Sequence, residues 1–477
     1  MKPLDSLSIL MMAMACALLA GCAVGPDFVT PSLATPTAYK EAPATAADWK
    51  QATAPGDRGA WWTVFNDATL NELEPQVAQG NQTLAQSEAQ YRQSQALVAQ
   101  ARSQFFPTLG VDASATRSGR ADASGSTHPT DNYSAGLSAS WEPDLWGRVR
   151  RTLEQSKANA AASAALLAST RLSLQAQLAQ DYLQLRVIDA QKQLLDATVA
   201  GYQRSLQVTQ NQYQAGVAAR ADVVQAQAQL ESAKAQAIDL GVSRAQTEHA
   251  IAVLVGKPPA GFSLPVQPLT LTTPMIPTGV PSDLLQRRPD IVAAQAQARA
   301  ANAAIGIAQA AWFPNLTLSG SGGYQSSIFS KWLTAPSRVW SLGPQLAATL
   351  FDAGARRAQT ASARAGYDAA VASYRQTWLA ALQNVEDELA AARILEQEAG
   401  VQDAAVRAAN ESLRITQNQY RAGIVSYLNV VSAQNAAYSA QRSSIALLGN
   451  RLQASVALIK ALGGGWDGQG STTPASP

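Results

Sequence analysis

The sequence has few of the residues on which cross-linked proteins and most enzymes depend. It contains only two cysteines, Cys16 and Cys22, and two histidines, His128 and His249, in 477 residues. Cys16 falls in an expected leader and Cys22 is expected to be modified, so no disulfide is predicted. Neither histidine has neighbours that suggest a metal site or a catalytic triad. These absences favour a protein that is not an enzyme and binds no cofactor or metal.

Long apolar runs and concentrated charge are also missing. After residue 22 no run approaches the roughly 20 apolar residues that a membrane helix needs, so any membrane crossing would require strands. No phosphate-binding glycine loop is present, so energy for transport would have to come from a partner. The net charge is +2, with Lys and Arg scattered along the chain. That distribution gives no indication of nucleic-acid binding.

The N-terminal residues predict an exported protein. Residues 1–21 have a positive start, an apolar middle and small residues at the end, which is typical of a secretory signal peptide. The final four, Leu19-Ala20-Gly21-Cys22, resemble a bacterial lipobox, in which Cys22 becomes the acylated N-terminus; the alternative is an ordinary signal peptide with a chance cysteine. Ala23 follows in place of an acidic residue, which implies export to the outer membrane. Residues 22–59 are rich in proline and read as an extended, lipid-anchored tether.

Two very long helices dominate the remainder. From Arg151 to Tyr213 and from Ala355 to Tyr420 the chain contains no proline, and apolar residues recur at spacings of three, four and seven. A seven-residue apolar repeat is typical of a coiled coil. At 1.5 Å per residue each helix would reach roughly 95 Å. That length favours a tall tube over a globule. A shorter helical region is expected from Asp67 to about Phe105, with a kink at Pro75.

The two long helices end in nearly the same sequence, which shows that the chain is duplicated. Thr209-Gln210-Asn211-Gln212-Tyr213-Gln214-Ala215-Gly216-Val217 returns as Thr416-Gln417-Asn418-Gln419-Tyr420-Arg421-Ala422-Gly423-Ile424, an offset of 420 − 213 = 207. Glycine closes a helix C-terminus, so each copy predicts the tip of a helical hairpin. The predicted divisions are a first repeat over 60–270 with its tip at about 213–222, a second repeat over 271–465 with its tip at about 420–429, and a flexible tail over 466–477.

Four stretches alternate apolar and polar residues with a period of two. They lie at about 108–118, 132–142, 314–325 and 339–351, and aromatic residues cluster at their ends. Each has the length of a tilted strand that crosses a bilayer; the alternative is a soluble sheet with one buried face. Four strands cannot close a barrel, and an open edge in lipid costs several kcal/mol for each unpaired backbone group. Three copies would supply twelve strands around a passage, so the sequence predicts a homotrimer.

Several motifs then carry a resemblance over nearly the whole chain after Cys22. They are the opening Trp61-Trp62-x-x-Phe65, the two tips above, and the run Asp283-Leu284-Leu285-x-Arg287-Arg288-Pro289-Asp290-Ile291 leading to Phe313-Pro314. The chain resembles the outer membrane factor family, the TolC-like and OprM-like outer-membrane efflux lipoproteins of the NodT type. The resemblance implies an α+β membrane protein: a trimeric twelve-stranded transmembrane β-barrel, with four strands per chain, continued by a long α-helical coiled-coil barrel.

The resemblance also implies a role and the residues that perform it. Family members give small molecules, antibiotics included, a passive exit from periplasm to exterior. They do so after docking a periplasmic adaptor (membrane fusion) protein and a proton-driven inner-membrane efflux pump. The implied adaptor-docking residues are Ala215, Gly216, Val217, Ala218, Ala422, Gly423, Ile424 and Val425. The implied periplasmic aperture comprises Asp222, Leu428, Asn429 and Ser432.

Some alternatives stay open at this stage. Ser432 stands where some relatives carry an acidic residue, which leaves Asp222 as the acidic candidate at the aperture; the other interpretation is that Asp222 caps a helix. The same duct could serve type I secretion of polypeptides. A non-conducting coiled-coil spacer is a rival of another class, but it would have no use for the alternating strands. The expected location is the outer membrane, anchored at Cys22, with the helical barrel in the periplasm.

Overall fold

A computed structural model describes residues 23–41, 58–121, 125, 127–274, 276 and 287–464. The predicted signal peptide, the predicted lipidation site Cys22, the start of the Asp283 motif and the predicted tail therefore lie outside the described residues. The chain divides into two compact units. Unit 1 comprises residues 1–32, 90–163 and 293–375, and unit 2 comprises 33–89, 164–292 and 376–477. Each unit draws residues from both sequence repeats.

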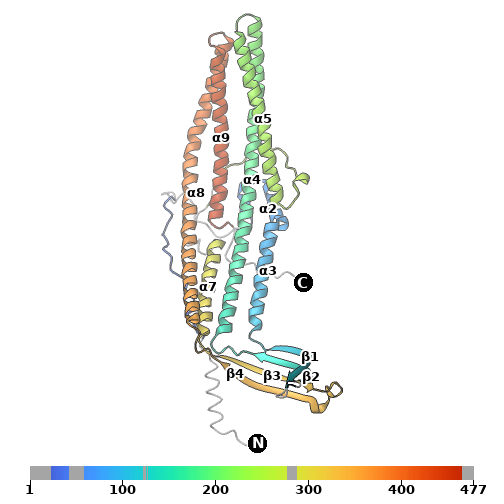
Figure 1. Ribbon diagram of the computed structural model, residues 1–477. Coiled ribbons are helices and arrows are strands. Elements are labelled where there is room, and N and C mark those ends of the chain that lie inside the picture. Colours follow the sequence, from blue (N-terminus) through green and yellow to red (C-terminus); the bar gives the residue numbers. More distant parts are fainter. Residues whose placement is uncertain are drawn as a thin grey trace. The chain divides into compact units, whose positions relative to one another are not determined.

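The duplication is present in the secondary structure (Figure 1). Four elements of the first half have counterparts whose first residues lie 207 positions later, and the three helices among them also end 207 positions later. The pairs are α3 (Gln82–Ser103) and α7 (Pro289–Ala310), β1 (Thr108–Ala121) and β3 (Asn315–Ser326), α4 (Arg148–Gln214) and α8 (Ala355–Arg421), and α5 (Arg220–Leu254) and α9 (Tyr427–Ala461). The predicted tandem repeat is confirmed.

The helix expected over Asp67–Phe105 is two helices, and they are not divided at Pro75, where a kink is predicted. Pro75 lies inside α2 (Ala68–Gly80), and the break comes at Asn81. The Asn81 side chain accepts a hydrogen bond from Leu84 N–H (3.0 Å), which caps α3, and donates to the Leu254 carbonyl (2.8 Å). A capping side chain with a tertiary partner starts a new helix here, whereas Pro75, the eighth residue of α2, does not end that helix.

Unit 1 holds a four-stranded antiparallel sheet in the order β1-β2-β3-β4, so β1 and β4 (Arg338–Ala347) are its edges. β2 (Thr127–Trp141) begins five residues before the expected start at 132, and β1 runs three residues past the expected end at 118. This extension of the hairpin carries an ion pair between Arg117 and Asp131 (3.6 Å), so the pairing continues where the apolar alternation stops. β4 ends at Ala347 instead of 351.

The strand register separates the side chains by polarity, since directly paired residues share a face. One face, here called the apolar face, carries Leu109, Val111, Leu137, Trp141, Leu316, Leu318, Tyr324, Trp340, Leu342 and Leu346. The opposite, polar face carries Thr108, Asp112, Ser114, Ser134, Ser138, Ser319, Ser321, Ser341 and Gln345. Hydroxyl pairs bridge strands on that face, as between Ser114 and Ser134 (2.8 Å). Leu109 and Trp340 are each 82% exposed, so the single chain leaves the apolar face uncovered.

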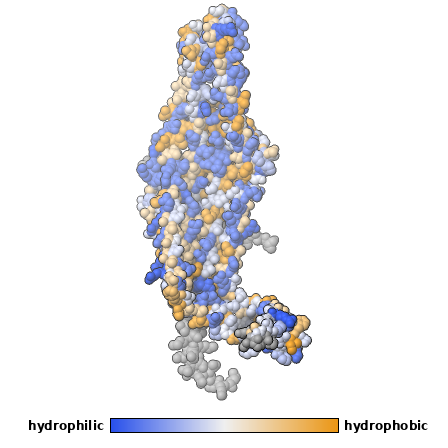
Figure 2. Space-filling view, in the orientation of Figure 1, coloured by the Kyte–Doolittle hydropathy of each residue, from blue (hydrophilic) through white to orange (hydrophobic). Residues whose placement is uncertain are grey.

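Unit 2 contains the main hydrophobic core. The aromatic residues of η1 (Arg58–Phe65), the inner face of α2, the middle of α4 and the end of α9 pack together. Along α4 the predicted seam residues Leu178, Leu185, Leu195 and Tyr202 are all buried. On the face drawn in Figure 2, hydrophobic and hydrophilic residues are intermixed over the helices. Among the described residues, no helix combines the length and the apolar character needed to cross a membrane.

Candidate functional site

The tips of the two helical hairpins in unit 2 have the same backbone geometry. Gly216 has φ +75°, its N–H bonds to the Tyr213 carbonyl (3.0 Å), and the Val217 N–H bonds to the Gln212 carbonyl (2.8 Å). This pair of bonds is the Schellman motif, which closes a helix with a residue in the left-handed region. A residue with a Cβ is disfavoured there, so each tip requires its glycine.

The second tip repeats these bonds one for one. Gly423 also has φ +75°, and its N–H bonds to the Tyr420 carbonyl (3.0 Å) while the Ile424 N–H bonds to the Gln419 carbonyl (2.9 Å). The structure thus places the predicted docking residues 215–218 and 422–425 at hairpin tips. Val217 and Ile424 are 71% and 72% exposed. Each tip therefore exposes one branched apolar side chain.

The predicted aperture residues follow the tips at the starts of α5 and α9. The Asp222 carboxylate accepts a hydrogen bond from the Ala219 N–H (3.3 Å), so Asp222 caps the start of α5. Leu428, Asn429 and Ser432 are exposed, and the Ser432 hydroxyl donates to the Leu428 carbonyl (3.0 Å). Within the described part of the chain, no hydrogen bond or ion pair joins Asp222 to these three residues.

A polar network that the sequence did not reveal joins the two hairpins below their tips. Thr209 and Tyr420 share a hydrogen bond between hydroxyls (3.1 Å), and the ring of Tyr420 packs 5.6 Å from that of Tyr427. Burial raises the pKa of Tyr427 to about 12, with smaller contributions from nearby groups that include Asp222. The two tips have nearly identical sequences but differ in the exposure of their tyrosines, since Tyr420 is 9% exposed and its counterpart Tyr213 is 46% exposed.

Amide side chains extend this network along the hairpins. Gln229 on α5 donates to Asn435 on α9 (2.6 Å) and to the Tyr202 hydroxyl (3.1 Å), and Gln434 donates to Ser205 (2.8 Å). Hydrogen bonds between neutral groups contribute only about 1 kcal/mol each and are exchanged readily for water. Contacts of this kind can hold two hairpins in register and still permit them to separate.

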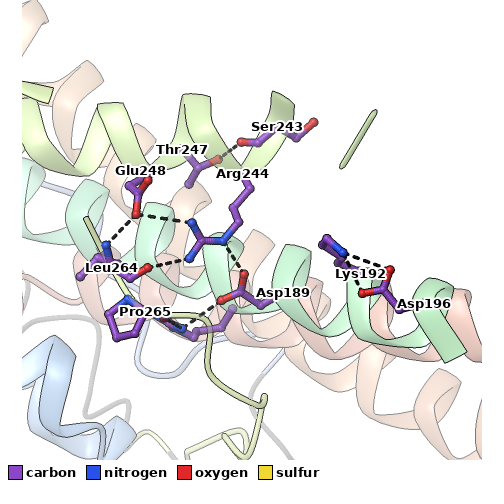
Figure 3. Close-up of polar contacts among 10 residues, drawn as sticks. Asp189, Lys192, Asp196, Ser243, Arg244, Thr247, Glu248, Leu264 and Pro265 are labelled. Carbon is purple, nitrogen blue, oxygen red and sulfur yellow. Dashed lines mark hydrogen bonds and ion pairs between the residues drawn. The ribbon is translucent and has the colours of Figure 1, made fainter. Parts of the chain in front are cut away.

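A buried ion-pair network lies further along the same helices (Figure 3). Asp189 on α4 accepts hydrogen bonds from Arg186 (3.0 Å) and from Arg244 on α5 (2.8 Å). Arg244 also donates to the Leu264 carbonyl (2.7 Å), and the Glu248 carboxylate accepts from the Leu264 N–H (2.6 Å). The network therefore fastens the irregular segment 262–274 to the α4–α5 hairpin.

Glu74 on α2 is another buried ionisable residue that the sequence analysis did not single out. It is fully buried in unit 2, and within the described part of the chain neither carboxylate oxygen has a hydrogen-bond partner. Burial raises the pKa of Glu74 to about 9, because the anion cannot be solvated there. The side chain is therefore protonated in the folded protein at neutral pH.

In unit 1, the first described residues of the chain are fixed at the start of α4. The Val24 N–H bonds to the Trp146 carbonyl (3.1 Å). The buried guanidinium of Arg151 donates to the carbonyls of Val24 (3.2 Å) and Gly25 (3.0 Å) and to the Asp27 carboxylate (2.9 Å). Trp146 itself stacks on Phe313, with ring centroids 4.8 Å apart. Residues 24–27 thus lie at the junction where strands pass into helices.

Comparison with known proteins identifies the family. The model of the family described as "Outer membrane efflux protein" matches residues 73–257 and 280–464. Both segments start and end 207 residues apart, the offset of the internal repeat. The chain belongs to the outer membrane efflux protein family.

Individual members of the outer membrane efflux protein family are similar over almost the full chain. The toluene efflux pump outer membrane protein TtgC and the antibiotic efflux pump outer membrane protein ArpC, both of Pseudomonas putida, are each 32% identical over 96% of this chain and 96% of their own. The solved structure of the outer-membrane channel OprN superposes with a TM-score of 0.85 at 31% identity, over 94% of this chain and 100% of that one. The predicted family and fold class are confirmed, and the family is one of outer-membrane channel proteins.

Proposed function

We propose that the protein is the outer-membrane channel component of a tripartite efflux system. The observation that carries the proposal is the sheet of unit 1, with one exposed apolar face and one hydroxyl-rich face. In lipid its edge strands β1 and β4 would leave backbone groups unpaired. Three chains joined edge to edge give twelve strands, with the apolar face toward lipid and the polar face toward a water-filled lumen.

The helical hairpins supply the periplasmic part of the duct. Three copies of α4–α5 and α8–α9 would form a coiled-coil barrel that ends at the tips. The exposed Val217 and Ile424 would dock the periplasmic adaptor, which links the channel to a proton-driven inner-membrane pump. Docking would part the hairpins by exchanging the neutral contacts of Thr209 and Tyr420 for water, and this opens the aperture near Asp222.

The cargo is proposed to be small toxic molecules. TtgC is named for toluene and ArpC for antibiotics. Both are equally similar to this chain, so similarity does not favour one cargo over the other. A wide passive duct has little substrate selectivity of its own, so the pump and adaptor would select the cargo. The duct does no chemistry, and no cofactor is invoked. Secretion of polypeptides through the same duct is the alternative.

The position of residues 24–27, bound at the start of α4, supports a lipid anchor at Cys22. Trp146 and Phe313 lie where the strands end, at the level expected for an aromatic girdle. A chain that is fixed there by Arg151 is well placed for acyl chains on the preceding residues to enter the inner leaflet. Labelling with radioactive palmitate, with Cys22→Ser as the negative control, tests this part of the proposal.

A tip substitution tests the efflux role. Gly423→Arg places a large cation in the docking surface and strains the turn, so efflux in a strain lacking its native channel should be abolished while assembly is retained. Gly400→Arg is the matched control, because Gly400 is exposed in the middle of α8 with open space around it. Normal efflux by Gly423→Arg, or equal loss in both variants, would count against tip docking. Purified protein that forms no conducting pores in a planar bilayer would count against the duct itself.

A further inference from the structure

The connection between β3 and β4 is a built loop, although it contains no long element. It includes two single turns, η4 (Phe329–Lys331) and η5 (Ala335–Ser337). The Lys331 carbonyl accepts hydrogen bonds from the Thr334 hydroxyl (2.6 Å) and the Ser337 hydroxyl (2.8 Å). These bonds fold the loop back on itself at the Lys331 backbone.

The loop is folded onto the apolar face of the sheet. The Phe329 ring lies 5.3 Å from the ring of Tyr133, edge to face, and Trp332 lies 6.0 Å from Phe329. Tyr133 shares its face with Leu137, four residues further along β2. Phe329 nonetheless remains 67% exposed, and Leu333 beside it is 65% exposed. An aromatic cluster therefore projects from the apolar face at the end of the sheet away from the helices.

The charge in the segment that carries this loop has a single sign, and the carboxylate on the same face of β2, Asp131, pairs with Arg117 (3.6 Å). No Asp or Glu occurs between residues 315 and 350, whereas Lys331 and Arg338 fall within that span. Arg338 pairs with Tyr324, so it also lies on the apolar face, and both basic side chains are exposed. Among the described residues neither one is in an ion pair. The loop and the start of β4 thus carry two exposed cations and exposed aromatic rings, with no carboxylate in this span.

We propose that this surface, made of Ile328, Phe329, Lys331, Trp332, Leu333 and Arg338 and here called the outer foot, binds the phosphate groups of an outer-leaflet glycolipid. The inference rests on the proposed function, which turns the apolar face to lipid and the β3–β4 loop to the exterior. The rings would then lie at the lipid–water boundary, where aromatic side chains are favoured. Ammonium and guanidinium groups at that level pair with phosphate by charge-assisted hydrogen bonds.

Lipid binding to the full chain in phosphatidylcholine nanodiscs tests the outer foot. Diphosphorylated lipid A is titrated and counted by native mass spectrometry, with dephosphorylated lipid A and phosphatidylglycerol as comparison ligands. Each cation near a charged surface contributes about 1 kcal/mol, or roughly fivefold in affinity, so K331Q/R338Q should bind lipid A about 25-fold more weakly. K157Q, at an exposed lysine in α4 of the same unit, should bind like the wild type.

The outcomes separate this inference from the proposed function. Weaker binding by the double variant, with unchanged pores in a planar bilayer, supports the outer foot. Equal binding by variant and wild type, or no preference of the wild type for the phosphorylated glycolipid over phosphatidylglycerol, overturns it while the duct stands. A wild-type protein that forms no pores would instead remove the proposed function.

Discussion

Removing the Asp189 carboxylate should release segment 262–274 from the helical hairpin. The Asp189 side chain is almost fully buried and accepts hydrogen bonds from two guanidinium groups, of which that of Arg186 is equally buried. Asp189→Ala leaves those cations without their shared anion. Breaking a buried ion pair from one side costs about 3–5 kcal/mol, and two charge-assisted bonds at about 1.5–3 kcal/mol each give about 3–6 kcal/mol.

Hydrogen exchange measured by mass spectrometry reports the loss of local stability in segment 262–274. A loss of about 4 kcal/mol corresponds to a roughly 10³-fold lower protection factor for amides in 262–274, such as Leu264. Asp196→Ala is the matched control, since Asp196 pairs with Lys192 on the exposed surface of the same helix (Figure 3). An exposed pair four residues apart contributes about 0.3–0.5 kcal/mol, so protection should change about twofold. If both variants lost the same protection, the network would not hold the segment.

Three further predictions concern separate parts of the chain. Folding raises the pKa of Glu74 from 4.5 to about 9, so the folded state loses stability as pH increases over that window. Glu74→Gln should raise the free energy of unfolding at pH 7 by about 3 kcal/mol, measured by chemical unfolding, and should make that free energy depend less on pH. Gly216→Ala should lower the free energy of unfolding by about 1 kcal/mol because Gly216 has a left-handed backbone, whereas Gly201→Ala inside α4 should raise it by a similar amount. A change of the same sign in both variants would refute the left-handed turn at Gly216. Arg151→Ala should expose the N-terminal residues to limited proteolysis, and Lys157→Ala should not.

The features that could be predicted from sequence are those that local periodicity encodes. The long helices show their seam residues at regular spacings, and a glycine after each one marks the turn at Gly216 and Gly423. The strands appear through alternation, but only where apolar residues alternate with small polar ones. The extension of β1 and β2 past Arg117 lacks that alternation, so the pattern does not predict it.

The missed features depend on contacts between residues far apart in the chain. Arg244 meets Asp189 across 55 positions, and Arg151 meets Gly25 across 126. An Arg and an Asp three residues apart on α4, in a stretch otherwise rich in apolar residues, was the one local signal of the buried network. The two tips differ in the burial of their tyrosines, since Tyr420 bonds to Thr209 of the facing hairpin and is 9% exposed, whereas Tyr213 is 46% exposed.

The central claim is that one chain supplies only part of a closed cylinder. Native mass spectrometry of the detergent-purified full-length protein measures this directly by counting chains in the intact particle. We predict a particle of three chains that dissociates only on denaturation. A stable single chain that still retains its strand signal by circular dichroism would contradict the account, because its β1 and β4 edges would then need no partner.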